Sequence, residues 1–262
     1  MEAAGRVAVV TGGASGIGAA LCGELAQRGA RAVVVADIDA AGARRVADAV
    51  GGRPIACDVA SAESVQRLAA AVIAEYGAID LFCANAGIGS GTDPFETPLP
   101  VWQRMWDVNV MSHVHAVRSV LPGMLERGDG HFLHTASISG VLTAHGMLPY
   151  ATTKHALVGL VEWLSVTYGH RGVGFSCLCP LGVRTPMLKT LPPEMAAVAG
   201  PFSEPEDIAR IALDGVADDQ LLIYSDPKVE TWVTRRFADE GRWLASMRKI
   251  QATVFDKSAF PA

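Results

Sequence analysis

The stretch LPYATTKHALVGL places Tyr150 and Lys154 four residues apart in a run of small and apolar residues. On a helix this spacing brings both side chains to one face, close enough to interact. A phenol has a pKa of about 10, and a neighbouring ammonium group favours the phenolate and lowers that pKa. The pair could therefore exchange a proton with a carbonyl or alcohol oxygen. The alternative is a tyrosine at the edge of the core beside a solvated lysine.

A glycine-rich segment near the start of the chain has the composition of a phosphate-binding turn. VAVVTGGASGIGAAL runs from a β-branched stretch through Gly12, Gly16 and Gly18 into a helical pattern. Glycines permit a tight turn and a close approach of ligand to backbone. The start of the following helix offers unpaired N–H groups to a pyrophosphate. The segment indicates dinucleotide binding, with an ordinary glycine-rich turn as the alternative.

An acidic residue at the end of the second predicted strand fits the same ligand. VVVADID places Asp37 about 20 residues after the glycines, where an acid binds ribose hydroxyls. A carboxylate there would repel a 2′-phosphate. No Arg or Lys directly follows Asp37, and Ser15 rather than a basic residue precedes Gly16. These residues favour NAD over NADP, unless Asp37 merely caps the next helix.

Short apolar runs alternate with longer helical patterns, and these elements must position the residues above. Strands are predicted at 6–11, 31–37, 53–58, 79–87, 130–137, 172–180 and 220–226, and helices at 16–29, 39–50, 61–77, 98–127, 150–171 and 204–217. The strand segments are continuously apolar, as expected for strands covered on both faces. Repeated β-α-β units predict an α/β fold with a doubly wound, Rossmann-like parallel sheet of about seven strands. Residues 1–262 are expected to form a single domain.

Composition narrows the class of protein and its partners. Of the 262 residues, 50% are hydrophobic, the net charge is −5, and the pI is about 5.8. An acidic chain without a Lys/Arg run favours neither nucleic acid nor an anionic membrane as a partner. The N-terminus lacks the pattern of a signal peptide, and no apolar run is long enough to cross a membrane. We therefore expect a cytoplasmic protein.

The five cysteines and seven histidines show no spacing typical of metal ligands. Cys177 and Cys179 are expected on one face of a strand, as buried thiols like the other three cysteines. His113 and His115 lie two residues apart, on different faces of a predicted helix. The sequence therefore predicts no metal site.

The chain resembles the classical short-chain dehydrogenases/reductases over residues 5–225. The resemblance rests on motifs that occur in the order of that family, namely TGGASGIG (11–18), CDV (57–59), NAG (85–87), Asn109, Ser137, YATTK (150–154) and PLGVRT (180–185). It implies a nicotinamide-dependent oxidoreductase in which Tyr150 is the general acid/base. Lys154 would be its electrostatic partner and a ligand of ribose. Ser137 would donate a hydrogen bond to the substrate oxygen, and Asn109 would hold a water behind the lysine.

The resemblance also implies how the cofactor is held. Asp58 and Val59 are similar to the residues that contact adenine, and Val183 and Thr185 to those that fix the nicotinamide carboxamide and the adjoining phosphate. Together with the glycine-rich segment, the expected cofactor-binding residues are Gly12, Ser15, Gly16, Ile17, Gly18, Asp37, Ile38, Asp58, Val59, Asn85, Ala86, Gly87, Tyr150, Lys154, Pro180, Gly182, Val183 and Thr185.

Two features depart from the family pattern. Pro180-Leu181 stands where the family has Pro-Gly, with Gly182 one place later, so the loop beside the nicotinamide is expected to differ. The usual Asp-Gly-Gly ending after the last strand is replaced by residues 226–262, which we expect to form a helical extension. Two interpretations are open for this extension: it covers the substrate entrance, within one subunit or across a subunit boundary, or it packs on its own domain.

Three segments should form the substrate wall beyond the carboxyl ends of the strands: 88–96, 139–149 and 184–203. The third resembles the mobile substrate lid of the family. The expected substrate-binding residues are Phe95, Ser137, Val141, Leu142, His145, Met147, Met187, Leu188 and Leu191. No basic cluster occurs in the first two segments, which favours a mostly apolar secondary alcohol or ketone. His145 could contact a polar substrate group or simply face solvent.

The predicted helices around 101–125 and 150–169 are apolar on nearly every face, which indicates burial on more than one side. A homodimer or homotetramer through these helices is therefore expected. The leading hypothesis is an NAD-dependent alcohol dehydrogenase or ketoreductase. The alternatives are an NAD-dependent diol, hydroxysteroid or hydroxyacyl dehydrogenase, or a catalytically silent NAD-binding redox sensor.

Overall fold

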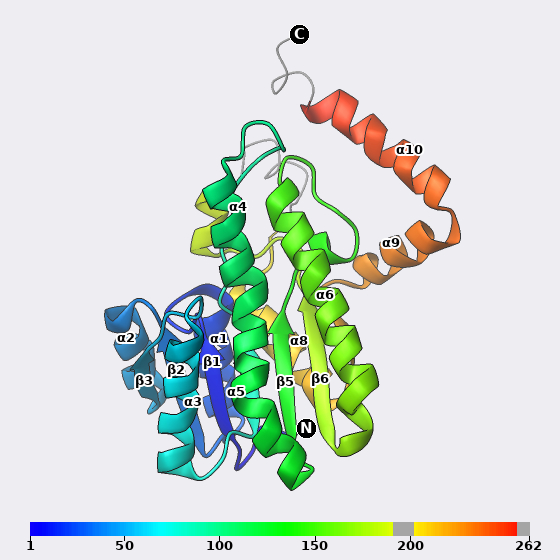
Figure 1. Cartoon of the computed structure of the whole chain (residues 1–262). Helices are drawn as coiled ribbons and strands as arrows, with labels where there is room; N and C mark the ends of the chain where they lie inside the picture. The colour runs from blue at the N-terminus through cyan, green and yellow to red at the C-terminus, as the bar shows by residue number, and fades with distance from the viewer. Residues whose placement is uncertain (191–201, 256–262) are drawn as a thin grey trace.

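A seven-stranded parallel sheet in the order β3-β2-β1-β4-β5-β6-β7 forms the centre of the protein (Figure 1). The computed structural model describes residues 1–190 and 202–255. The strands are β1 (Val7–Thr11), β2 (Ala32–Asp37), β3 (Arg53–Ala56), β4 (Leu81–Ala84), β5 (Gly130–Thr135), β6 (Val173–Cys179) and β7 (Leu222–Tyr224). This order reverses direction beside β1, which is the arrangement of a doubly wound Rossmann-like fold. The predicted fold class is confirmed.

Helices cover both faces of the sheet, and each face has its own hydrophobic core. One core joins the sheet to α3 (Ala62–Tyr76), α5 (Ser112–Arg127) and α6 (Leu148–Tyr168). The other joins it to α1 (Gly16–Gln27), α2 (Ala40–Val50) and α8 (Pro205–Ala217). Because side chains of both faces are buried, the strands need apolar residues at successive positions, as the sequence indicated. Every residue of β1, β4 and β5 is buried.

The predicted helix at 98–127 is confirmed as a helical segment, but it is not regular throughout. It consists of α4 (Leu99–Trp106), a π-helical turn at Asp107–Met111, and α5. A π-helical turn adds a residue to one turn and rotates the side chains that follow it, often at a functional position. Asn109 lies within this turn and is 0% exposed.

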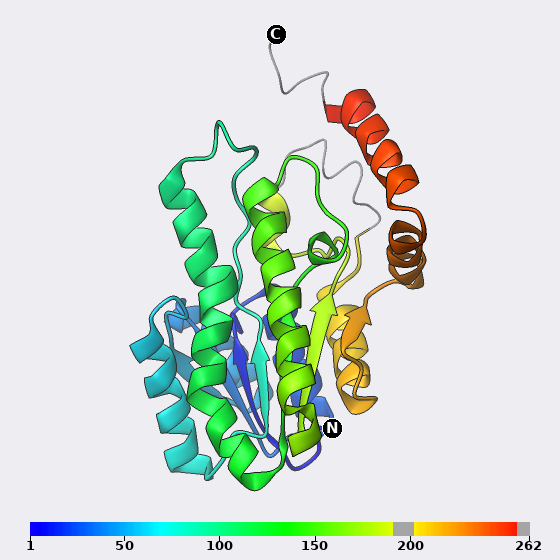
Figure 2. The same ribbon diagram turned by 45° about the vertical axis from the view of Figure 1, so that its right-hand side comes forward.

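The C-terminal extension also forms two helices rather than one, α9 (Pro227–Ala238) and α10 (Glu240–Ile250), followed by a π-helical turn at Gln251–Phe255. Asp239 ends α9 and caps α10, because its side chain accepts a hydrogen bond from the Arg242 N–H. The second helix lies outside the two helical layers of the domain (Figures 1 and 2). Across the described part of the chain, no helix combines the length and the apolar character that a bilayer crossing requires.

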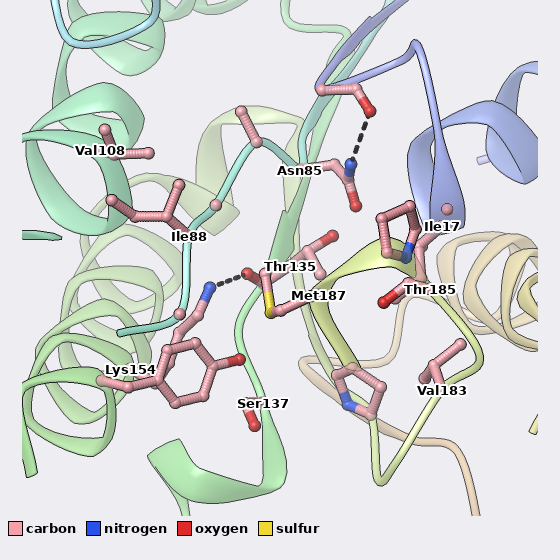
Figure 3. Close-up of a pocket in the computed structure, with 18 of the residues that line it drawn as sticks. Ile17, Asn85, Ile88, Val108, Thr135, Ser137, Lys154, Val183, Thr185 and Met187 are labelled. Atoms are coloured by element: carbon pink, nitrogen blue, oxygen red, sulfur yellow. Dashed lines mark hydrogen bonds between the residues drawn. The ribbon is translucent and has the colours of Figure 1, made fainter. Parts of the chain in front are cut away.

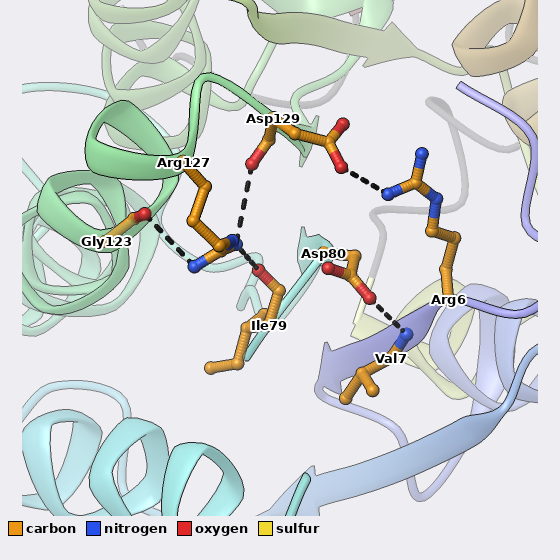
Figure 4. A network of polar contacts seen from close by, with 7 residues as sticks. All are labelled: Arg6, Val7, Ile79, Asp80, Gly123, Arg127 and Asp129. Carbon is orange, nitrogen blue, oxygen red and sulfur yellow. Dashed lines mark hydrogen bonds and ion pairs between the residues drawn. The ribbon is translucent and has the colours of Figure 1, made fainter. Parts of the chain in front are cut away.

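Polar contacts secure the amino-terminal edge of the sheet, opposite the end where ligands bind in such folds (Figure 4). The Asp80 carboxylate accepts from the Val7 N–H at 2.8 Å, and Arg6 pairs with Asp129. Arg127 donates to the Ile79 carbonyl at 2.9 Å and so connects α5 with the segment before β4. These contacts fix β1, β4 and α5 relative to one another and leave the carboxyl edge free for a site.

Candidate active site

One cavity of about 590 Å³ collects nearly all of the predicted cofactor and catalytic residues. Of the expected cofactor-binding residues, only Gly18 does not line it. A Cβ on Gly18 would lie 2.1 Å from the Gly12 carbonyl oxygen, so this glycine allows α1 to pack tightly against the turn rather than to touch a ligand. Ser137, Tyr150 and Lys154 line the same cavity.

The glycine-rich turn has the geometry of an anion cradle. Gly12 has φ +66 and Gly16 has φ +53, conformations that L side chains rarely adopt. A Cβ on Gly12 would lie 2.8 Å from the Ala86 Cα. The first turn of α1 contains no acidic residue, and Ser15, at its N-cap, makes no side-chain capping bond. The positive end of the α1 dipole therefore faces the cavity, which fits the pyrophosphate of a dinucleotide.

Asp37 ends β2 at the wall of the cavity. Its carboxylate accepts from the Ala14 N–H at 3.0 Å and from the Asp39 N–H at 2.9 Å. Asp39 rather than Asp37 caps α2, by accepting from the Gly42 N–H. The capping alternative for Asp37 is therefore wrong. A carboxylate held in place by backbone donors at this edge fits the ribose hydroxyls of a dinucleotide.

Lys154 is almost fully buried, and its Nζ atom donates to the Thr135 carbonyl at 2.8 Å (Figure 3). The same Nζ lies 5.6 Å from the centre of the Tyr150 ring. Helix α6 carries both residues one turn apart, and β5 supplies the carbonyl that anchors the lysine. The spacing i, i+4 thus places a cation beside the phenol, as the sequence predicted.

The electrostatic effect on the phenol differs from the expectation. Burial raises the pKa of Tyr150 above its usual value, and the hydrogen bond with Ser137 lowers it only in part. Burial also lowers the pKa of Lys154 to about 8. The residues of the chain alone therefore do not produce the predicted lowering of the Tyr150 pKa, because desolvation outweighs the hydrogen bond with Ser137.

Ser137 follows β5 and begins the 3₁₀ turn Ile138–Gly140. Its Oγ accepts from the Ser139 N–H at 3.1 Å, which fixes the side chain, and its hydroxyl bonds with Tyr150. Figure 3 places Ser137 and Lys154 around the same part of the cavity.

Asn109 does not line the cavity, although sequence reasoning grouped it with the catalytic residues. Its Oδ1 accepts from the Ile88 N–H at 2.9 Å, and its Nδ2 donates to the Ile88 carbonyl at 2.9 Å and to Thr153 Oγ1 at 3.1 Å. The amide therefore ties the segment after β4 to α6, directly behind Lys154.

The structure brings only part of the predicted substrate wall to the cavity. Met147, Met187 and Leu188 line the cavity, whereas Phe95 is 87% exposed and does not. Val141 and Leu142 are buried in the core instead of facing the cavity. His145 also lies outside the lining, and its Nδ1 lies 2.9 Å from Gln251 Oε1. Leu191 falls outside the described residues.

Several cavity residues lie outside both the predicted site residues and the predicted wall segments: Cys57, Arg104, Val108, Thr135, Ala136, Ile138 and Leu181. Ile88, Gly89, Ser139 and Pro186 also line the cavity and belong to the predicted wall segments, although the sequence did not single them out. Most are neighbours of a motif in the sequence, so proximity to the motif was an available signal. Arg104 had no such signal, because it precedes Asn109 by five residues and reaches the cavity from the last turn of α4. It adds a cation to a wall that was expected to be apolar.

The two described ends of the segment 184–203 are joined to each other by contacts between residues 182–184 and residues 203–204. Val183 pairs with Ser203, the Ser203 N–H donates to the Gly182 carbonyl at 2.9 Å, and Arg184 pairs with Glu204 at 2.7 Å. The 3₁₀ turn Pro186–Thr190 carries Met187 and Leu188 to the cavity. The remaining residues of this segment, 191–201, lie outside the described residues.

Comparisons with known proteins agree with this geometry. Residues 6–196 match the family model of the short chain dehydrogenases. The chain is 34% identical to 1-deoxy-11-beta-hydroxypentalenate dehydrogenase of Streptomyces exfoliatus, covering 92% of this chain and 90% of that protein. It is 34% identical to D-threitol dehydrogenase of Mycolicibacterium smegmatis, covering 84% and 88%.

A solved structure has the same fold. A short chain dehydrogenase/reductase from Burkholderia phymatum, in complex with NAD, superimposes with a TM-score of 0.84 at 30% identity and covers 92% of this chain and 95% of its own. The chain therefore belongs to the short-chain dehydrogenase/reductase family of oxidoreductases.

Proposed function

We propose that the protein is an NAD-dependent oxidoreductase that interconverts a mainly apolar secondary alcohol and its ketone. The observation that carries this proposal is the shared cavity in which Ser137, Tyr150 and Lys154 lie beside the glycine cradle. Hydride transfer to a carbonyl carbon builds negative charge on the oxygen, and that oxygen needs a proton. A nicotinamide dinucleotide supplies the hydride acceptor or donor.

In the direction of oxidation, Tyr150 removes the hydroxyl proton of the alcohol while Ser137 donates a hydrogen bond to the same oxygen and orients it. In reduction, Tyr150 returns that proton. Lys154, anchored at the Thr135 carbonyl, supports the phenolate form by its charge and is placed to bind ribose hydroxyls. Because burial raises the pKa of Tyr150, the phenolate also depends on the positive charge of the oxidised cofactor.

The preference for NAD over NADP is supported by Asp37. Its carboxylate is fixed by two backbone N–H groups at the ribose end of the cradle, where a 2′-phosphate would meet a like charge. The structural neighbour from Burkholderia phymatum, whose complex contains NAD, agrees with this preference.

The apolar side chains of Ile88, Ile138, Met147, Met187 and Leu188 support a mainly apolar substrate. Arg104 favours a second candidate, an alcohol that also carries a carboxylate, because a guanidinium group on the cavity wall suits such a group. Two relatives dehydrogenate a pentalenate and a threitol, so a diol remains an alternative, as do hydroxysteroids and hydroxyacyl compounds.

A panel of secondary alcohols with NAD, followed by the absorbance of NADH, tests the proposal. The panel should contain apolar alcohols, matched hydroxy acids and vicinal diols. Turnover of apolar alcohols supports the leading proposal, and turnover of hydroxy acids that is lost in Arg104→Gln supports the second. Tight NADH binding with no turnover on any member would instead support a silent NAD-binding sensor.

Assembly and substrate access complete the proposal. Exposed apolar side chains on α4 and α6, among them Leu99 and Trp163, support a homodimer or homotetramer. The segment 184–203 is proposed as a substrate lid because its two ends meet at Val183 and Ser203 while Met187 reaches the cavity.

A further inference from the structure

Residues 141–147 join the turn after Ser137 to α6, and we call this segment the wall because its last residue, Met147, lines the cavity. The 3₁₀ turn after Ser137 ends at Gly140, and the chain then runs to Leu148, where α6 begins. Between these points Met147 reaches the cavity, one residue before α6. Whatever fixes this wall therefore also sets the space beside Ser137 and Tyr150.

The carbonyl groups of Val141 and Leu142 both accept hydrogen bonds from a residue of the C-terminal extension. Nη1 of Arg236, in the last turn of α9, donates to the Val141 carbonyl and, at 2.9 Å, to the Leu142 carbonyl. Val141 and Leu142 have buried side chains, so these carbonyls are anchored on one side by the core and on the other by a guanidinium group.

Aromatic rings hold the guanidinium group itself. The Arg236 Cζ lies 4.9 Å from the ring centre of Trp243 and 5.6 Å from that of Phe237. Trp243 comes from α10 and packs against the same core that contains Val141. Helix α9 ends at Asp239, and the chain changes direction there before α10 begins. This change of direction allows Trp243 of α10 to stack on Arg236 of α9.

The charge of Arg236 is satisfied without an acid. Among residues 1–190 and 202–255, no carboxylate pairs with it, and its contacts are two carbonyl dipoles and two aromatic faces. A planar guanidinium group suits this arrangement because it can stack on a ring while its N–H groups point sideways. A second contact, His145 Nδ1 to Gln251 Oε1 at 2.9 Å, joins the wall to the residue that follows α10.

We propose that Arg236 is a positioning residue that clamps residues 141–147 and thereby sets the affinity for substrate in the cavity. The inference rests on the proposed function, since it assigns this wall to the substrate. It gives the extension a definite role, in which α9 and α10 act through the wall rather than by contact with the reacting atoms. Arg236 touches neither Tyr150 nor Ser137, so the chemical step should survive its loss.

Three variants test the clamp: Arg236→Met, Arg236→Lys and the matched control Arg235→Met, which alters the exposed neighbour on the same helix. Loss of two charge-assisted hydrogen bonds should raise KM for the substrate by about tenfold in Arg236→Met, with kcat and the Kd for NADH nearly unchanged. Arg236→Lys should restore only part of the affinity, because an ammonium group lacks the planar fork. Arg235→Met should match the wild type.

Hydrogen exchange separates failure of the clamp from failure of the proposed function, because it needs no substrate. In Arg236→Met the amides of 141–147 should exchange faster, whereas those of α5 should not change. Faster exchange confined to this wall, together with the KM effect, supports the inference. Unchanged exchange overturns it even if the enzyme turns over alcohols. An unchanged KM overturns it as well. So does a combined loss of substrate affinity, kcat and NADH affinity that accompanies a lower thermal midpoint, because that result indicates general destabilisation.

Discussion

Tyr150 and Lys154 show how far one pair of residues can be interpreted from spacing. Their separation predicted the shared helix face, and the structure places the Lys154 Nζ atom beside the phenol. The spacing said nothing of burial, which raises the pKa of one group and lowers that of the other. Geometry follows from local periodicity, whereas the pKa depends on every layer packed around the pair.

Removal of the phenolic hydroxyl should separate chemistry from folding. Tyr150→Phe deletes only the proposed proton donor, so kcat should fall by at least about 100-fold while NADH affinity and the thermal midpoint stay close to those of the wild type. Tyr168→Phe, at the far end of the same helix, is the control and should keep full activity. Initial rates together with NADH fluorescence titration measure both effects. Substantial turnover by Tyr150→Phe would remove this residue from the mechanism.

The pKa of Tyr150 also predicts a dependence of rate on pH. In the protein without cofactor, the pKa of Tyr150 lies above the ordinary value of a tyrosine. The phenolate needed for oxidation therefore becomes more populated as pH rises. Alcohol oxidation should therefore accelerate from neutral to alkaline pH, and ketone reduction should slow over the same range. Initial rates at saturating cofactor in both directions provide the measurement. A flat profile in both directions would mean that proton transfer does not limit the rate.

Asp37 carries the preference between cofactors. Asp37→Ser removes the carboxylate that we assign to the ribose hydroxyls, so NADH should bind about tenfold more weakly while NADPH gains relative to it. Asp48→Ser changes an exposed carboxylate on α2 and serves as the control. Fluorescence titrations with each reduced cofactor measure the ratio. An unchanged NADH to NADPH ratio would contradict the assignment.

Elements were predictable where a single periodicity dominates. The seven strands and the helices α1, α2, α3, α6 and α8 appear within a few residues of the positions that apolar runs indicated. The π-helical turn at Asp107–Met111 was not predictable, because its residues continue the helical pattern of α4 and α5. Arg104 was missed for a related reason, since it meets the cavity only through the packing of α4.

This turn predicts a structural role for Asn109. Asn109→Ala leaves the Ile88 N–H and carbonyl and the Thr153 hydroxyl without their amide partner in a buried site. The free energy of unfolding should fall by about 2–3 kcal/mol, because buried polar groups without partners are costly. Gln103→Ala removes an exposed amide on α4 and should cost less than about 0.5 kcal/mol. Urea denaturation measures both, and equal values would show that the buried bonds add no stability.

Buried histidines make the whole molecule sensitive to acid. His113 and His134 approach each other at 2.9 Å between their Nδ1 atoms, and His131 contacts Ser176 at 2.9 Å. Burial lowers the pKa of His131 and of His134 to about 3, and that of His113 well below its usual range. The folded state keeps these rings neutral, whereas the unfolded chain binds protons once pH falls below about 6.5. Their contribution to stability is therefore complete above that pH and lost progressively between it and about pH 3.

From pH 7 to pH 5 each such histidine should cost about 2 kcal/mol of unfolding free energy, at about 1.36 kcal/mol per pH unit. Urea denaturation at the two pH values measures the loss. His131→Asn should reduce the difference between the two pH values by about one histidine's share, whereas His170→Asn, at an exposed position, should not. If His131→Asn and the wild type lose the same free energy, burial of this ring is not the source of the acid sensitivity.

The outer face of α6 carries exposed apolar side chains that suit a contact between subunits. Trp163 is 58% exposed and Val166 is 83% exposed, and they lie one turn apart on a helix whose opposite face is fully packed on the sheet. Helix α5 runs beside it, so the two helices present a common face (Figures 1 and 2). Apolar side chains at such positions are stable when a second copy covers them, since burial contributes about 25 cal/mol per Å² of apolar surface.

Val166→Arg should therefore shift the protein towards monomers, because a charge in the centre of such an interface loses its water. Ile73→Arg changes an apolar side chain of α3 that is 41% exposed, and it should leave the assembly unchanged. Light scattering coupled to size-exclusion chromatography at micromolar concentrations measures the mass of each variant. A monomeric wild type would contradict the interface outright. A multimer that survives Val166→Arg would move the contact away from α6, and the exposed side chains of α9 and α10 would then be the next surface to substitute.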